Sequence, residues 1–365
     1  MAKAKKLYII TTGGTISQKR DKITGRSEDA GQTDGNVFAE LLKDELDNHG
    51  YEVEVVEGTK EPKDSSNIVP EDWVSIIDTI VKYYDKADSF LITHGTNTLG
   101  YTSAALSFAF GNLGRRVVLT GSQVPHGSSG SDALMNLQNA ARVAMTDEKE
   151  LFGVVVVFGS KIITGARVKK RTEFDYDGFD SFSTTFPIGR VGSKLKFDEN
   201  ALKEHNDHYK LRARIADQLE VFKKFNSNIV SLTEFPGMSP KIFEALYDEL
   251  KVEGFVFRAV GAGDPNIAPD NAAHTYTNLK EAFDFLQSRK IPIVVTTQSA
   301  TGTSSMDINP SGITAHKMGA IEAWDMSMEA MTVKLMWLLG KGAKYEHIRG
   351  MMHSSVKGEV IVTNQ

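Results

Sequence analysis

The chain has 365 residues, 41% hydrophobic and 24% charged, which is an ordinary globular composition and a length that usually means two domains. The net charge of −5 excludes the basic surface of a nucleic-acid-binding protein, and the absence of cysteine excludes disulfides, thiol catalysis and cysteine-ligated metals. Because no stretch approaches the ~20 apolar residues that span a bilayer and the start lacks a signal-peptide core, we expect a cytoplasmic protein without membrane contact.

Short runs rich in valine and isoleucine alternate along the chain with segments of helical spacing. The predicted strands are 7–10, 52–56, 89–93, 116–120, 153–158, 228–232, 254–260 and 292–296. One predicted helix opens at Pro70, since proline is favoured in a first turn, and another follows Ser239, which we expect to be its N-cap. The methionine- and leucine-rich segment 326–339 predicts a packed helix. Apolar strands separated by amphipathic helices indicate an α/β fold with a parallel sheet, whose ligands should lie beyond the carboxyl ends of the strands.

The region from about Lys194 to Phe225 carries mixed charge and no clear strand pattern, and strand signals resume at Ile229. We interpret this region as a partly helical link between two domains. The expected organisation is an N-terminal α/β catalytic domain over residues 1–200, a connector over 201–227, and a smaller C-terminal α/β domain over 228–365.

Two of the predicted strands end in a glycine turn that presents a threonine. The two segments read Ile9-Ile10-Thr11-Thr12-Gly13-Gly14-Thr15 and Ile92-Thr93-His94-Gly95-Thr96. Two hydroxyls at strand ends suit covalent attack on a carbonyl, with one hydroxyl as nucleophile and the other relaying protons. Backbone N–H groups of Gly14, Gly95 and their neighbours could bind the oxyanion that forms. A threonine nucleophile needs a base nearby, and Lys170 is a candidate if burial lowers its pKa.

With these residues the chain resembles the bacterial-type L-asparaginases, most closely the cytoplasmic (type I) branch and its archaeal relatives. The resemblance extends over nearly the whole length. It rests on Thr12-Gly13-Gly14-Thr15-Ile16, Asp64-Ser65-Ser66, Pro70-Glu71-Asp72-Trp73, Thr93-His94-Gly95-Thr96, Tyr101-Thr102-Ser103-Ala104-Ala105-Leu106-Ser107-Phe108, Leu119-Thr120-Gly121-Ser122-Gln123-Val124-Pro125, Ser131-Asp132 with Asn136, and Asp177-Gly178-Phe179-Asp180. Unrelated folds would not carry all of these motifs in this order.

The resemblance implies a role for each matching residue. Thr15 would be the nucleophile on a side-chain amide, and Thr96 with Lys170 would form the second catalytic group. The implied substrate-binding residues are Gly14, Ser65, Ser66, Gly95, Asn97, Ser122 and Asp264. Among them, Ser65 would hold the substrate α-carboxylate, and the backbone at Ser122 would contact the leaving amide. The resemblance also implies a homodimer or homotetramer, with each site at a dimer interface and completed by Asp264 of a partner copy, and it implies neither cofactor nor metal.

Two positions depart from the family pattern. The family has Gly-Thr-Asp where this chain has Gly95-Thr96-Asn97, and that Asp pairs with the substrate α-ammonium and orients the lysine. Relatives also carry a tyrosine in the loop after the nucleophile, whereas this chain has none between Ile16 and Gly50. Three residues could replace the tyrosine, and the sequence does not choose among them: Lys19, Lys22 and Asp29.

The expected activity is hydrolysis of L-asparagine to L-aspartate and ammonia, and several alternatives stay open. One is an amidase for a related ω-amide that lacks a free α-ammonium. Others are a low-activity sensor on the same fold and a variant in which Asn97 was introduced by mutagenesis. A transamidosome subunit shares the motifs but usually has an additional N-terminal domain, which we do not expect because Thr15 lies so near the start. At the level of single residues, Thr15 and Thr96 could merely cap turns, Lys170 could be a solvated lysine, and His94 is more simply a hydrogen-bonding strand-end residue than a catalyst.

Overall fold

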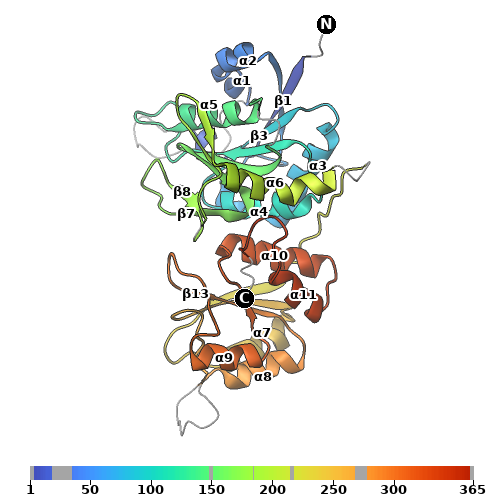
Figure 1. Cartoon of the computed structure of the whole chain (residues 1–365), viewed down its shortest axis with the longest axis vertical. Coiled ribbons are helices and arrows are strands. Elements are labelled where there is room, and N and C mark those ends of the chain that lie inside the picture. Colours follow the sequence, from blue (N-terminus) through green and yellow to red (C-terminus); the bar gives the residue numbers. More distant parts are fainter. Residues whose placement is uncertain are drawn as a thin grey trace. The chain divides into compact units, whose positions relative to one another are not determined.

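The computed structural model describes residues 4–18, 35–147, 151–183, 185–213, 218–267 and 278–361. The chain divides into two compact units, the first comprising Met1–Ser181 and Thr185–Lys223, and the second Phe182–Thr184 and Lys224–Gln365. Each unit has its own β-sheet with helices on both faces (Figure 1), which confirms the predicted α/β fold. Within the described ranges, no helix has both the length and the apolar character needed to cross a membrane.

The first unit contains a mixed sheet of eight strands in the order β10-β9-β6-β5-β4-β3-β1-β2. These strands are β1 (Lys5–Thr11), β2 (Tyr51–Glu57), β3 (Ser89–Thr93), β4 (Arg116–Thr120), β5 (Gly153–Phe158), β6 (Lys161–Thr164), β9 (Gly189–Val191) and β10 (Leu195–Phe197). The five strands from β2 to β5 run parallel, as predicted. The other three pair antiparallel at one edge and were not predicted, because strands of three or four residues are too short to show a period. A separate hairpin joins β7 (Val168–Lys170) to β8 (Phe179–Ser181).

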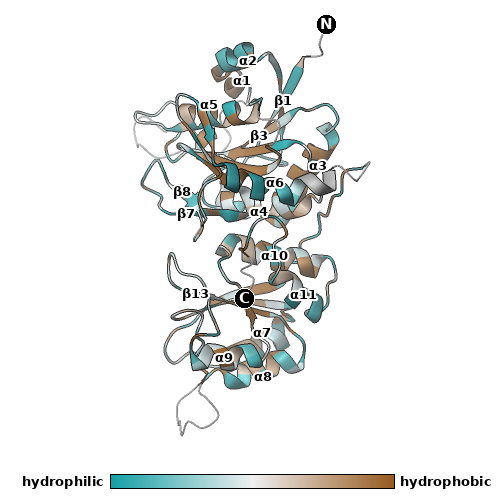
Figure 2. Cartoon of the chain, viewed as in Figure 1, coloured by the Kyte–Doolittle hydropathy of each residue, from teal (hydrophilic) through white to brown (hydrophobic). Residues whose placement is uncertain are grey.

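Helices of the first unit cover both faces of this sheet. They are α1 (Asn36–Leu41), α2 (Lys43–His49), α3 (Pro70–Tyr83), α4 (Leu99–Ala109), α5 (Ala133–Ala144) and α6 (Glu199–Ala213), with short 3₁₀ turns η1 (Thr15–Ser17), η2 (Ser65–Asn67) and η3 (Gly165–Arg167). Successive side chains of β1 point to opposite faces of the sheet, and both faces are covered, which explains why the strand sequence is continuously apolar. Leu7 and Ile9 join a core cluster with α1, α2 and α5, whereas Tyr8 stacks on Tyr83 of α3 on the opposite face. Figure 2 shows the central strands as hydrophobic and helices such as α2 and α6 as largely hydrophilic.

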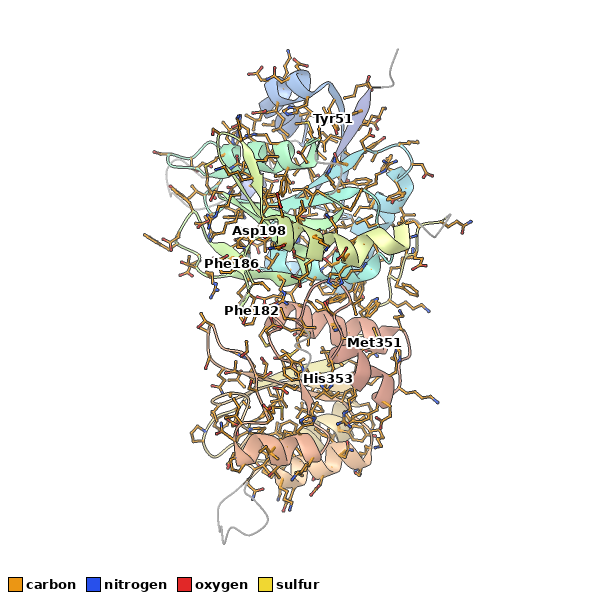
Figure 3. All side chains as sticks on the ribbon, in the orientation of Figure 1. Tyr51, Phe182, Phe186, Asp198, Met351 and His353 are labelled. Carbon is orange, nitrogen blue, oxygen red and sulfur yellow. The ribbon has the colours of Figure 1, made fainter. Side chains whose placement is uncertain are left out.

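Helix α6 occupies the segment for which the sequence suggested a connector, and it belongs to the first unit. Asp198 stands immediately before it (Figure 3), and its carboxylate accepts a hydrogen bond of 2.9 Å from the backbone N–H of Ala201. Further along, a Cβ on Gly153 would lie 2.5 Å from the ring of Tyr209, so this helix packs tightly against the start of β5. The division between units falls after this helix, at residues 223 and 224.

The second unit contains a parallel sheet of four strands in the order β11-β12-β13-β14. Its elements are β11 (Ile229–Thr233), β12 (Gly254–Ala259), β13 (Ile293–Thr297), β14 (Ile321–Glu322), α7 (Lys241–Leu250), α8 (Lys280–Ser288), α9 (Pro310–Lys317), α10 (Met328–Gly340) and α11 (Tyr345–Met352). Helices α7, α8 and α9 lie on one side of the sheet and α10 and α11 on the other (Figure 1). Helix α10 is buried along most of its length, which confirms the packed helix predicted from its methionines and leucines.

Two of the expected helix starts can be compared directly with the structure. Helix α3 begins at Pro70, as predicted. Helix α7 begins at Lys241 with Pro240 in the N-cap position, so the expectation that Ser239 caps it is wrong by one residue. Proline is well suited to the entry of a helix but has no side-chain acceptor, and the Ser239 hydroxyl only approaches the N–H of Lys241, at 3.4 Å.

Candidate active site

The turns that follow β1 and β3 touch each other through their glycines. These strands are parallel neighbours, with Thr11 opposite Thr93, so their carboxyl ends meet at one edge of the sheet. A Cβ on Gly14 would lie 2.3 Å from the Cα of Gly95, and Gly14 also has a φ of +81°, so only glycine fits there. The contact brings the segments that carry the next residues, Thr15 and Thr96, into a single cluster.

A third turn, Asp64–Asn67, completes this cluster. The backbone of Lys63 forms a bridge to Gly13, and its carbonyl accepts the N–H of Gly14 at 3.0 Å. The N–H of Gly14, which the sequence suggested for oxyanion binding, is therefore already engaged. On the other side, the Ser65 hydroxyl oxygen would lie 2.6 Å from a Cβ of Gly95 and accepts the N–H of Asn97 at 3.2 Å. Ser65 is thus buried directly beneath the Gly95 turn.

Lys170 reaches the cluster from a different part of the chain. It ends β7, which follows η3, and η3 is held to α4 by a hydrogen bond of 2.8 Å from the Ser103 hydroxyl to the carbonyl of Gly165. The Lys170 amino group donates to the Thr96 hydroxyl oxygen at 2.9 Å and to the Asn97 side-chain oxygen at 3.1 Å. Burial lowers the pKa of Lys170 from its ordinary value, and the nearby Glu173 and Asp64 carboxylates oppose this effect. A lysine with a lowered pKa next to a hydroxyl can act as a base.

The orientation of the Asn97 amide follows from its partners. An ammonium group only donates hydrogen bonds, so the amide oxygen must face Lys170 and the amide nitrogen must face the other way. The nitrogen donates to the Ser66 hydroxyl at 2.8 Å. Ser66 and Asn97 are both exposed, and the backbone N–H of Ser66 donates to the Asp64 carboxylate. The side of Asn97 that faces Ser66 therefore presents hydrogen-bond donors.

His94 supports the Gly95 turn from below. Its Nδ1 lies 2.7 Å from the carbonyl oxygen of Gly95, and because a carbonyl only accepts, Nδ1 carries the proton. Its Nε2 then accepts from the Thr102 hydroxyl, whose oxygen in turn accepts from the Trp73 indole. Burial lowers the pKa of His94 to about 4, so the ring is neutral. These contacts agree with the interpretation of His94 as a hydrogen-bonding strand-end residue.

The turn after β4 packs against the same region. A Cβ on Gly121 would lie 2.3 Å from the carbonyl oxygen of His94. The following residue, Ser122, is fully buried, and its hydroxyl has no hydrogen-bond partner within the described part of the chain. Asp132 and Asn136 hold this turn: the carboxylate accepts the backbone N–H of Gln123, and the amide donates to the Gly121 carbonyl. In the sequence these two residues were noted only as part of the family motif. No pattern in the neighbouring residues predicted that they support the site.

The structure thus gathers most of the predicted site residues in the first unit. The cluster includes Gly14, Thr15, Ser65, Ser66, Gly95, Thr96, Asn97 and Lys170, with Ser122 in the adjoining turn. Asp264 belongs to the second unit, where its carboxylate accepts the amide of Asn309 and the backbone N–H of Ala262. The three candidate replacements for the loop tyrosine lie outside the described residues. Over the described ranges, no group of three or more histidine and acidic side chains is arranged to hold a metal ion.

Comparison with known proteins relates both units to one family. The family model for "Asparaginase, N-terminal" matches residues 6–203, and the model for "Glutaminase/Asparaginase C-terminal domain" matches residues 228–352. The chain is 33% identical to the L-asparaginase of Thermococcus kodakarensis over 357 residues, which are 97% of this chain and 99% of that protein. The solved structure of the thermostable L-asparaginase from Thermococcus kodakarensis superposes with a TM-score of 0.81, covering 98% of this chain and 99% of that one.

A second kind of relative also appears. The chain is 30% identical to a glutamyl-tRNA(Gln) amidotransferase subunit of Pyrococcus abyssi over an alignment of 366 positions, and this alignment covers 96% of this chain and 76% of that protein.

Proposed function

Because the chain belongs to the asparaginase family, we propose that it is an amidohydrolase that releases ammonia from the side-chain amide of L-asparagine or of a close structural relative of asparagine. The observation that carries this proposal is the hydrogen bond of 2.9 Å between Lys170 and Thr96, on a turn whose Gly95 touches Gly14 immediately before Thr15. Nucleophile, relay hydroxyl and base are the groups that acyl transfer through threonine needs.

In the proposed reaction, the Thr15 hydroxyl oxygen attacks the amide carbon and its proton passes to a neighbouring base. Backbone N–H groups of the Gly95–Thr96 turn are candidates to stabilise the oxyanion of the tetrahedral intermediate. The carbon–nitrogen bond then breaks, the nitrogen takes up a proton and leaves as ammonia, and an ester on Thr15 remains. Lys170 in its neutral form accepts a proton through Thr96 from an attacking water, which cleaves the ester to the carboxylic acid and restores Thr15.

The test is ammonia release from asparagine, glutamine, succinamate and N-acetyl-L-asparagine. We expect at least one of these amides to be hydrolysed, and we expect Thr15→Ala to abolish that activity. Thr79→Ala, on α3, serves as the matched threonine control and should leave the rate unchanged. Hydroxylamine should intercept the ester as a hydroxamate in the wild-type chain only. If no amide is hydrolysed, or if Thr15→Ala retains the activity, the proposal is wrong.

The relation to the amidotransferase supplies a second candidate function. In that case the ammonia would pass to a tRNA-linked amino acid on a partner protein instead of being released. Steady-state turnover of a free amide by the isolated chain favours the hydrolase. Turnover that appears only when an amidotransferase partner and an acylated tRNA are added favours the second function.

We also propose that the chain acts in the cytoplasm as a homodimer or homotetramer in which Asp264 of one copy completes the site of another. The support is the family resemblance together with the membership of Asp264 in the second unit. Light scattering measures the assembly state. Mixing inactive Thr15→Ala and Asp264→Ala chains under conditions of subunit exchange should restore part of the activity, because some mixed sites then contain both native residues. A monomer, or mixtures that stay inactive, would count against this arrangement.

A further inference from the structure

The most informative departure from the family pattern is the amide of Asn97. Its oxygen is occupied by the amino group of Lys170 at 3.1 Å, and its nitrogen is directed at the Ser66 hydroxyl at 2.8 Å. One of the two N–H bonds of that nitrogen serves Ser66, and the other remains for a ligand. The Ser66 oxygen accepts from Asn97, so its own proton can be donated as well. A substrate that contacts this pair meets two donors.

Within the described part of the chain, the two carboxylates that act on Lys170 are those of Glu173 and Asp64. Glu173 is exposed, and Asp64 accepts the backbone N–H of Ser66 at 2.7 Å. A free ammonium that approaches the Asn97 amide would face its N–H donor, because the amide oxygen is already bound to the Lys170 amino group. An acceptor group in the same place would be matched by both donors.

Building on the proposed function, we propose that Asn97 and Ser66 form a subsite that selects ω-amides carrying a hydrogen-bond acceptor, and no free ammonium, next to the reacting chain. The class comprises monoamides of dicarboxylic acids, such as succinamate, and asparagines acylated on the α-nitrogen. Asparagine itself is disfavoured because its ammonium lacks a counter-charge at position 97. Asn97 is the specificity-determining residue of this subsite.

Two measurements test the subsite independently of one another. The first compares kcat/KM for succinamate, N-acetyl-L-asparagine and L-asparagine in the wild-type chain and in Asn97→Asp. We expect the wild type to prefer one of the first two amides over asparagine. Asn97→Asp, which changes shape little, should shift the ratio towards asparagine by about 5-fold, which is the most that a charge pair at an exposed position usually supplies. Circular dichroism and the melting temperature check that the variant folds.

The second measurement is calorimetric binding of the products succinate, N-acetyl-L-aspartate and L-aspartate, which requires no turnover. Tighter binding of succinate or N-acetyl-L-aspartate than of L-aspartate supports the subsite even if no amide is hydrolysed, in which case only the proposed function fails. Equal or tighter binding of L-aspartate, or binding of none of the three, overturns the subsite. A wild-type kcat/KM for asparagine as high as for the other amides also overturns it.

Asp64 is the control for the competing explanation. If this carboxylate supplies the counter-charge for an ammonium, Asp64→Asn should selectively lower kcat/KM for asparagine while sparing succinamate. That result would overturn the assignment to Asn97. Under the proposed subsite, Asp64→Asn affects all three amides alike, because its carboxylate acts on the backbone of Ser66 and not on the substrate.

Discussion

The buried neutral ring of His94 makes a specific prediction about acid stability. The side chain is fully buried and its two nitrogens are occupied by the Gly95 carbonyl and the Thr102 hydroxyl. Burial lowers its pKa from 6.5 to about 4, so between these values the unfolded chain binds a proton that the folded chain excludes. The stability that comes from keeping His94 neutral in the folded chain is fully present above pH 6.5 and is lost as the pH falls towards 4.

The size of the effect follows from the two pKa values. Linkage between a pKa of 6.5 in the unfolded chain and about 4 in the folded chain gives a loss of about 2 kcal/mol from pH 7 to pH 5. Other groups titrate in the same interval, so the loss must be isolated with a variant that cannot titrate. His94→Asn serves, because its amide nitrogen can still donate to the Gly95 carbonyl and every other titratable group is retained.

The assay is urea unfolding followed by tryptophan fluorescence at pH 7 and pH 5, at one protein concentration so that any assembly equilibrium is held fixed. At pH 7 the wild type should be more stable, because the variant leaves a gap and an unpaired Thr102 hydroxyl. At pH 5 that advantage should shrink by about 2 kcal/mol. If both chains lose the same stability between the two pH values, the assignment of a neutral buried His94 is wrong.

Three further predictions concern the catalytic cluster and the second unit. Burial lowers the pKa of Lys170, so a plot of kcat against pH should rise with a midpoint below 10.5. In Lys170→Arg this rise should disappear, and kcat should fall by about 10²-fold or more. Gly14→Ala places a methyl group 2.3 Å from a neighbouring backbone Cα, so both kcat and melting temperature should fall. Glu359→Gln leaves the fully buried ammonium of Lys334 without its counter-charge and should lower the free energy of unfolding by about 3–5 kcal/mol, whereas adding Lys334→Met should recover most of this loss.

Each of these outcomes can fail in a distinct way. A pH profile of Lys170→Arg that matches the wild type would remove Lys170 from proton transfer. Full activity in Gly14→Ala would show that the close contact of the two turns does not matter for the reaction. A double variant as unstable as Glu359→Gln alone would mean that the lost stability comes from the hydrogen bonds of Glu359 to the backbone of 356 and 357, and not from the unpaired charge.

Most parallel strands of both sheets could be predicted from the sequence, and the central ones, such as β3, β5 and β13, are fully buried. The central strands are rich in apolar residues, whereas β2 alternates apolar and charged residues. Each predicted range lies within one residue of an observed strand or inside it, and the two-residue strand β14 was not predicted. The antiparallel edge strands β6, β9 and β10 and the hairpin β7–β8 could not be predicted in this way. They are short, and their polar residues, such as Lys161, are held by partners far along the chain, here the carboxylate of Asp180.

The same difference separates the predictable part of the site from the rest. Thr15 and Thr96 follow parallel neighbouring strands, so their proximity follows from sheet topology once the strands are recognised. Lys170 lies on the unpredicted hairpin, so the sequence could name it as a candidate base but could not show that it lies beside Thr96. The support from Asp132 and Asn136 depends on hydrogen bonds to backbone groups of a loop, and no residue pattern reports which backbone groups those are.

Asn97 shows most clearly why sequence alone stops short of substrate specificity. A neutral amide in place of a carboxylate can be read from the sequence, but an amide presents a donor on one side and an acceptor on the other. Which side meets the substrate is decided by Lys170, 73 residues away, because its amino group donates a hydrogen bond to Asn97 and therefore requires the amide oxygen on that side. The donor face is then turned to Ser66, so the substitution does more than remove a charge. It reverses the hydrogen-bonding character of the position, and under the proposed subsite a chain with Thr15, Thr96 and Lys170 acts on a different class of amide.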